Sequence, residues 1–359
     1  MNPSLIPTFE PDSPYRRLAR SLDALPNRFP PADDESDLRL LAKLFTPEEA
    51  DLAANLQPRP ETPAQIAARL GRDARELMPM LKEMSKKGLI AFGKTDEGRP
   101  GFGLMPFVVG IYEAQGERID AEMARLFEDY YQKAFRGVLE LKPQVHRVIP
   151  VGVSIKNTME VQPYESVNSL LSRMQSWGVI NCVCRVEKKL IGDPCDHPVD
   201  VCMVLSDRPD AFAQSSDVRA LTYAEAQQTL TRAAQAGLVH CVSNNQRDLW
   251  YICNCCTCSC GVLRGMAELG IANVVARSAF VNQVDEDLCI GCGTCLSACQ
   301  FHALELNGTV HVQEIRCVGC GVCVPVCPEG ALSLSRRPGE PEPPLTDLDW
   351  QAARSAARQ

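Results

Sequence analysis

Apolar positions recur at helical spacing along the first hundred residues and predict a run of short helices. The segments SDLRLLAKLF (36–45), TPEEADLAANL (46–56) and PAQIAARL (63–70) come first. The last two begin at a Thr-Pro step with Glu or Gln three residues after the threonine, which is the pattern of a helix capping box. A longer helix is predicted at 74–87, and the stretch at 89–105, interrupted by a polar turn, predicts a β-hairpin.

This order of helices followed by a hairpin resembles the winged helix-turn-helix family over residues 38–107. The resemblance implies that the helix at 74–87 would read the major groove of DNA. Residues 59–99 have nine Lys or Arg against six Asp or Glu, and Pro79 lies inside the helix, so a docking or dimerisation role is favoured over DNA binding. The side chains that would contact DNA are Arg72, Arg75, Lys82, Lys86 and Lys87.

Residues 108–280 mix helical and extended patterns and predict an α+β domain. Helices are expected at 117–135, at 163–178 with an end at Gly178, and at 222–237; strands are expected at 146–155, at 179–186 and directly after Gly237. The predicted fold class is therefore α+β and multidomain. A Pro-rich arm (1–37) and a Pro/Glu-rich tail (337–359) flank the domains, and Trp350 in the tail is a candidate anchor on a partner or on the body.

The chain of 359 residues is 45% hydrophobic and 23% charged, the balance of a globular protein with more than one domain. Its net charge of −8 does not indicate a general nucleic-acid binder. The first residues lack the apolar run of a secretory signal, and the most apolar segment, GFGLMPFVVGIY, is far shorter than the ~20 residues of a membrane helix. A cytoplasmic protein without a membrane span is expected.

Clustered cysteines direct the functional interpretation, because the chain has 18 of them. In a reducing compartment such clusters indicate metal ligands or redox groups rather than disulfides. Residues 289–299 read CIGCGTCLSAC and residues 317–327 read CVGCGVCVPVC, so the pattern C-x2-C-x2-C-x3-C occurs twice. In such a run three thiolates bind one iron–sulfur cluster and the fourth binds the other cluster.

Residues 281–336 resemble the bacterial 2[4Fe–4S] ferredoxin family on these two runs. The resemblance implies two [4Fe–4S] clusters, and the segments ALEL and ALSL are expected to form short strands. Gln300 stands where the first run usually has proline, which leaves the ligand count intact. Zinc is the alternative, although zinc sites usually pair two short CxxC knuckles. The implied ligands are Cys289, Cys292, Cys295 and Cys327 for one cluster, and Cys317, Cys320, Cys323 and Cys299 for the other.

The central cysteines predict further metal sites, above all in CNCCTCSC (253–260), which has five cysteines in eight residues. One or two additional [4Fe–4S] clusters are expected there, with zinc as the alternative; a reactive dithiol would leave most of these thiols unused. In extended backbone, Cys253 and Cys255 share one face while Cys256, Cys258 and Cys260 share the other, unless a turn separates them. The candidate ligands are Cys182, Cys184, Cys195, Cys202, Cys253, Cys255, Cys256, Cys258 and Cys260.

The division of these ligands stays open. In one assignment the four cysteines between 182 and 202 hold one cluster and four from CNCCTCSC hold the other; in the second, each group contributes to both clusters. Arg185 and Arg264 are expected to donate hydrogen bonds to cluster sulfides. His197 is the histidine to test as a ligand, whereas the residues interpreted as ordinary packing or surface positions are His146, His240 and Cys241.

The whole pattern over 105–335 resembles bacterial 4Fe–4S ferredoxin-type proteins and implies iron–sulfur redox work. The favoured function is an electron carrier that relays single electrons to or from a partner oxidoreductase, with a homodimer as one possible state. The first alternative is a redox-responsive winged-helix regulator. The second is a reductase in which a central cluster binds substrate. The sequence assigns no catalytic residue, and it contains no flavin, NAD(P) or nucleotide motif.

Overall fold

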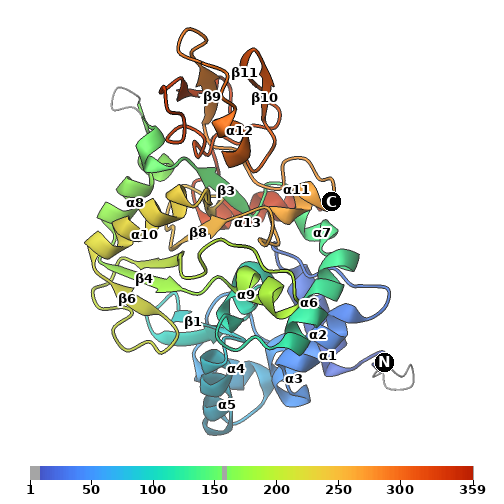
Figure 1. Ribbon diagram of the computed structural model, residues 1–359. Helices are drawn as coiled ribbons and strands as arrows, with labels where there is room; N and C mark the ends of the chain where they lie inside the picture. Colours follow the sequence, from blue (N-terminus) through green and yellow to red (C-terminus); the bar gives the residue numbers. More distant parts are fainter. Residues whose placement is uncertain (1–8, 156–159, 359) are drawn as a thin grey trace. The chain divides into compact units, whose positions relative to one another are not determined.

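The computed structural model describes residues 9–155 and 160–358 and divides the chain into two units (Figure 1). The N-terminal unit comprises Met1–Val138 and Leu190–Gly192, and the C-terminal unit comprises Leu139–Lys189 and Asp193–Gln359. Both helices and sheets are present, as the α+β prediction requires. Among the described residues, no helix is long and apolar enough to cross a membrane.

The N-terminal unit contains the predicted helices and hairpin in the predicted order. Thr46 and Thr62 each form the expected reciprocal capping box with the Glu or Gln three residues later. Pro79 does not end its helix, which loses one backbone hydrogen bond there. A bridge between Glu61 and Phe102 extends the hairpin. The elements are α2 (Ser36–Leu44), α3 (Pro47–Ala54), α4 (Pro63–Leu70), α5 (Ala74–Lys86), β1 (Ala91–Lys94) and β2 (Pro100–Gly103).

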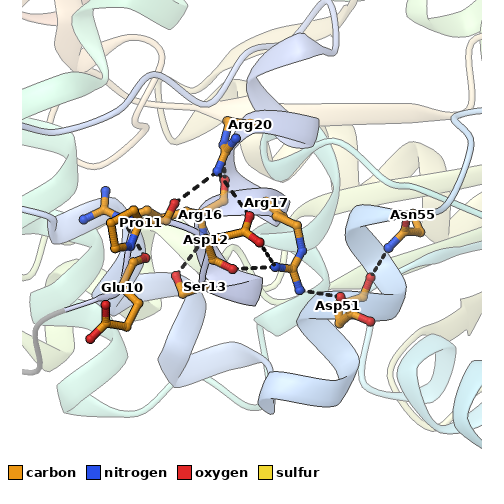
Figure 2. Close-up of polar contacts among 9 residues, drawn as sticks. All are labelled: Glu10, Pro11, Asp12, Ser13, Arg16, Arg17, Arg20, Asp51 and Asn55. Atoms are coloured by element: carbon orange, nitrogen blue, oxygen red, sulfur yellow. Dashed lines mark hydrogen bonds and ion pairs between the residues drawn. The ribbon is translucent and has the colours of Figure 1, made fainter.

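The predicted N-terminal arm contains a helix that the sequence reading missed, α1 (Pro14–Ala24). Its Leu18 and Leu22 are buried, so the segment follows an i, i+4 apolar stripe in spite of its many prolines. Figure 2 shows polar contacts that α1 makes with α3. Arg17 Nη2 lies 2.6 Å from Asp51 Oδ1.

An aromatic core surrounds α6 (Ala121–Ala134), which confirms the helix expected at 117–135. Phe127 stacks on Tyr112 with ring centroids 3.9 Å apart, and Tyr130 and Tyr131 are fully buried beside it. The short helix α7 (Arg136–Leu139) follows.

The C-terminal unit contains, within its described residues, a six-stranded antiparallel sheet in the order β3-β7-β8-β5-β4-β6. Apolar side chains such as Val242, Ile252 and Met203 pack with Leu171 and Leu230 in the core on one face. Because side chains alternate, the neighbouring cysteines lie on the opposite face. The strands are β3 (His146–Ile149), β7 (Val239–Ser243), β8 (Tyr251–Cys255), β5 (Cys202–Ser206), β4 (Ser176–Ile180) and β6 (Arg219–Leu221); the helices are α8 (Val167–Arg173), α9 (Val183–Leu190), α10 (Tyr223–Gln235) and α11 (Arg264–Ala267).

Three element predictions in or beside this sheet are wrong. The strand expected at 146–155 ends at Ile149, and Gly152–Ser154 form a short 3-10 helix. The helix expected to end at Gly178 stops at Arg173, and Gly178 lies inside β4, where a Cβ atom would be 2.3 Å from Val218. The extended run expected at 179–186 becomes helical from Val183, so Cys184 belongs to α9. The following Arg, Glu and Lys residues favour a helix over a strand. The helix at 222–237 and the strand after it are confirmed by α10 and β7.

The segment with the two cysteine repeats forms small antiparallel strand pairs that confirm the strands expected at ALEL and ALSL. In the tail, Trp350 is buried and its Nε1 donates to the carbonyl oxygen of Gln144 at 2.9 Å, so of the two predicted anchors, a partner or the body, it has the second. The elements are β9 (Phe280–Val284), α12 (Thr294–Ala298), β10 (Leu304–Asn307), β11 (Thr309–Val312), β12 (Leu332–Arg336) and α13 (Asp347–Ala356).

Candidate iron–sulfur and cysteine sites

The first cysteine run lines a pocket together with one cysteine of the second run. Cys289, Cys292, Cys295 and Cys327 all border this pocket. Cys295 is on α12, while Cys289 and Cys292 lie in the preceding loop and Cys327 is the last cysteine of the second run. The structure therefore brings together the four side chains that the ferredoxin resemblance pairs.

The remaining four cysteines of the repeats also gather. Burial, together with the charges of the nearby thiols of Cys317 and Cys299, raises the pKa of Cys320 to about 12. Burial likewise raises the pKa of Cys323, and the same neighbours contribute. Asn282 Nδ2 donates to Cys323 Sγ at 3.3 Å. Cys299, from the first run, thus lies with three cysteines of the second.

Glycine permits the tight loop that places these thiols. Gly319 has φ of 71°, a left-handed conformation, and an added Cβ atom would lie 2.0 Å from the carbonyl oxygen of Phe280. A side chain at this position is therefore excluded by both backbone conformation and space. The loop from Cys317 to Cys320 depends on that close approach.

Gln300 connects the repeat segment to the central cysteines. Its Oε1 accepts a hydrogen bond from the backbone N–H of Thr257 at 2.8 Å, and its Nε2 donates to the carbonyl oxygen of Gly237. Thr257 lies within CNCCTCSC, and Gln300 directly follows Cys299. The residue that departs from the ferredoxin pattern is the one that joins the two cysteine-rich regions.

Six of the described central cysteines form a closed series of neighbouring thiols, here called the thiol ring. Interaction with Cys184 and then Cys202 lowers the pKa of Cys182 well below its usual value, whereas the interaction with Cys182 raises the pKa of Cys184. Each thiol interacts with the next in the order Cys182, Cys184, Cys260, Cys255, Cys253 and Cys202, and Cys202 interacts with Cys182 to close the ring.

Sheet register explains why these thiols meet. Cys241 of β7 is paired with Cys253 of β8, and residues directly opposite each other share a face of the sheet. Cys255 is two residues after Cys253 on β8, so its side chain lies on the same face. The pairing of β5 with β8 places Cys202 at the level of Cys253.

His146 and Cys241 join this face and were missed as functional candidates. The ligand atoms of His146, Cys241 and Cys255 all lie within 4.8 Å of one another. Burial lowers the pKa of His146, and neither of its ring nitrogens has a hydrogen-bond partner among the described residues. The sequence indicated only that His146 and Cys241 lie in predicted strands. It did not indicate which strands pair, and that pairing is what brings the two residues to the other cysteines.

A second group, here called the quartet, contains Cys195, His197, Cys256 and Cys258, whose ligand atoms all lie within 4.8 Å of one another. The structure separates Cys195 from the other cysteines between 182 and 202 and places it with part of CNCCTCSC. It therefore favours the mixed division of ligands.

The expected shared face of Cys256, Cys258 and Cys260 is wrong, because β8 ends at Cys255 and a turn follows. The turn directs Cys256 and Cys258 to the quartet and Cys260 to the thiol ring. That turn spans residues 257–259, after Cys256 and not between Cys255 and Cys256, and the run contributes thiols to two groups, as the sequence reading allowed.

Arg185 supplies the positive charge among these thiols. Burial lowers the pKa of this guanidinium, but the charges of nearby thiolates, including Cys182 and Cys256, outweigh that effect and raise it. Its nitrogens donate to the carbonyl oxygens of Pro198 at 3.0 Å and Asn254 at 2.6 Å. Its Nε has no partner among the residues described.

Arg264, the other arginine expected to face cluster sulfides, is instead paired with a carboxylate. Its Nε lies 2.7 Å from Glu268 Oε1 and its Nη2 lies 2.8 Å from Glu268 Oε2. This bidentate ion pair within one turn of chain accounts for the burial of the guanidinium.

A family model described as a 4Fe-4S dicluster domain matches residues 282–334. This match covers the two cysteine repeats and supports iron–sulfur electron transfer in general terms. A search of curated proteins and a search of solved structures each gave no match.

Proposed function

We propose that this chain is a multi-cluster iron–sulfur electron carrier that relays single electrons to or from a partner oxidoreductase. The observation that carries the proposal is the thiol ring, which is joined through Gln300 to a segment matching a dicluster domain. Clusters of this type, when bound, exchange electrons at potentials set by their surroundings.

In this proposal the dicluster segment holds two [4Fe–4S] clusters. The pocket lined by the first group of four cysteines supports one site, and the gathering of the second group supports the other. The proposed ligands are Cys289, Cys292, Cys295 and Cys327 for the first, and Cys317, Cys320, Cys323 and Cys299 for the second.

The thiol ring holds at least one further cluster. The chemistry of the residues fits such a group, because thiolates are the usual ligands of iron–sulfur clusters. Two buried donors beside the ring support the fit: the ring nitrogens of His146 and the Nε of Arg185 have no partner among the described residues. Buried polar groups left without partners are costly, and a bound anionic cluster would accept hydrogen bonds from them.

Direct contacts give electrons a short path between these sites within the C-terminal unit. Cys299 is adjacent to Gln300, whose side chain binds the backbone of Thr257 in CNCCTCSC. The loop that carries Cys320 is also held, because the backbone N–H of Val151 donates to the carbonyl oxygen of Cys320 at 2.9 Å. These bonds fix the separation of the proposed clusters.

The N-terminal unit is proposed to be a winged-helix docking or dimerisation module. Arg72, just before α5, and Arg75, Lys82 and Lys86 on α5 are exposed, but Lys87 at its C-cap is paired with Glu49 at 2.8 Å. Glu76 and Glu83 are exposed on the same helix and would repel phosphates. A regulator that binds DNA is therefore the second candidate.

The test is a redox titration of the anaerobically purified full chain, followed by electron paramagnetic resonance. The proposal predicts about three or more electrons per chain, since the dicluster segment alone accounts for about two. A Cys292→Ser variant should lose or alter one dicluster signal and keep the central signal. A chain that accepts no electron beyond the two of the dicluster segment would refute the central relay.

A further inference from the structure

The quartet differs from the thiol ring in its ligand set and in its geometry. It contains three thiols and one imidazole, and Cys258 Sγ lies 3.6 Å from His197 Nδ1. Three cysteines and one histidine form a set typical of tetrahedral structural zinc sites. We propose that Cys195, His197, Cys256 and Cys258 bind one zinc ion, separate from the iron–sulfur clusters.

The spacing of the ligand atoms favours a single ion. With zinc–sulfur bonds of about 2.3 Å, the corners of a tetrahedral site are roughly 3.8 Å apart. The quartet, with all separations within 4.8 Å, is close to that size. The ligands of a four-iron cluster stand farther apart, because each thiolate binds a different iron atom around a cubane.

The local chain geometry presents the ligands in two short pairs. Cys195 and His197 come from the loop before β5, and Cys256 and Cys258 come from the turn after β8. Each pair is separated by one residue. Zinc sites are usually built from two short pairs of ligands on separate segments, and the pairs here are tighter than the usual knuckle, which encloses about two to four residues.

Neighbouring groups supply a hydrogen bond and a positive charge to the ligands. Ser259 Oγ donates to Cys195 Sγ at 3.2 Å, a contact of the kind that orients metal ligands. Three thiolates and one zinc ion leave one negative charge, and the buried Arg185 lies near Cys256 with a compensating positive charge. The site is therefore supplied with both hydrogen-bonding and charge partners.

Such an ion would join the two segments that flank the thiol ring. The loop that carries Cys195 leads into Cys202, and the turn that carries Cys256 and Cys258 connects Cys255 to Cys260. A metal cross-link there would hold ring cysteines from both segments in place. The ion therefore has a structural role and need not exchange electrons.

The experiment counts zinc, iron and acid-labile sulfide in the anaerobically purified full chain and in two pairs of variants. His197→Ala should lower zinc affinity by more than about tenfold, whereas His197→Cys should keep about one zinc ion per chain, because four thiolates also bind zinc tetrahedrally. The double variant Cys256→Ser/Cys258→Ser should lose zinc and keep its iron and sulfide. The matched control Cys184→Ser/Cys202→Ser should keep zinc and lose about four iron ions, those of the central cluster.

Retention of about one zinc in the wild type and in His197→Cys, with loss in His197→Ala, supports the inference even if the double variant does not fold. A wild-type protein without zinc, together with a Cys256→Ser/Cys258→Ser variant that loses about four iron and four sulfide ions, would overturn the inference and assign the quartet to a cluster. Zinc content unchanged in His197→Ala and in the double variant would also overturn it. The zinc content tests the quartet, whereas the iron content tests the thiol ring. A failure of this inference can therefore be distinguished from a failure of the electron-carrier proposal.

Discussion

At the scale of single residues, a substitution of Gly319 tests whether the Cys317–Cys320 loop requires glycine at this position. Gly319→Ala places a Cβ atom 2.0 Å from the carbonyl oxygen of Phe280 in a left-handed conformation. We expect a loss of more than about 3 kcal/mol in stability and of about four iron ions per chain, because the loop cannot keep its path. Thermal unfolding and iron analysis measure both.

Gly270→Ala is the matched control, since Gly270 has φ of 64° and nothing within 4 Å of an added Cβ atom. It should cost only about 1 kcal/mol, the strain of a left-handed non-glycine residue, and keep all iron. Equal effects of the two substitutions would show that close approach to Phe280 is not what the loop requires.

Gln300 is the residue whose role the structure most changes. Gln300→Ala removes its bonds to Thr257 and Gly237, leaving a backbone N–H and a carbonyl without their partner. We expect a loss of about 1–3 kcal/mol in stability with unchanged iron content. Electron exchange between the dicluster segment and the centre should slow, as measured by freeze-quench spectroscopy after rapid reduction.

Ser297→Ala is the control for that experiment, because the exposed Ser297 only bonds the carbonyl oxygen of Thr294 within α12. It should change neither stability nor the rate of exchange measurably. An unchanged exchange rate in Gln300→Ala would remove Gln300 from the electron path.

At the scale of elements, α9 brings Arg185 among the thiols. Arg185→Gln removes a buried positive charge, and the central cluster should then be harder to reduce, with a more negative potential. Arg185→Lys keeps the charge and should retain most of the wild-type potential. A spectroscopic redox titration measures the difference; a potential that moves equally in both variants would indicate lost packing instead.

The start of α2 is held to α6 by Asp34, which bonds Lys133, Ser36 and Arg39. Burial opposes ionisation, but these hydrogen bonds outweigh it and hold the pKa of Asp34 below its usual value. The stability that results is present above the unfolded pKa of about 3.9 and is lost as pH falls through the folded pKa.

Asp34→Asn should therefore weaken hydrogen-exchange protection of α2 at neutral pH by no more than about 1 kcal/mol, because the pair is partly exposed and screened. The difference from the wild type should shrink below about pH 4. A difference that stays constant down to about pH 2 would contradict this linkage.

Local rules predicted elements well where one segment contains its own signal. Thr46 and Thr62 mark helix starts through side chains three residues away, and both are observed. The same rules failed at Gly178, whose position in β4 depends on Val218 from a distant segment. They also failed at Cys184, where the β-type run VINCVCRV suggested a strand although helix-favouring residues follow.

At the scale of the whole molecule, the dicluster segment was predictable because its ligands are close in sequence and its repeat is specific. For the central sites, the sequence predicted which cysteines are candidate ligands but not how they divide between sites. Their division depends on strand register, which opposes Cys241 to Cys253, and on a turn after Cys255. For the same reason His146 was passed over: only pairing of its strand brings it to the cysteines.

The most direct test of the account counts iron and acid-labile sulfide in the anaerobically purified full chain and in its Cys184→Ser/Cys202→Ser variant. We predict about twelve of each in the wild type, from two dicluster sites and one central site, and about eight in the variant. About eight in both proteins would contradict the central cluster and leave the dicluster segment as the redox element.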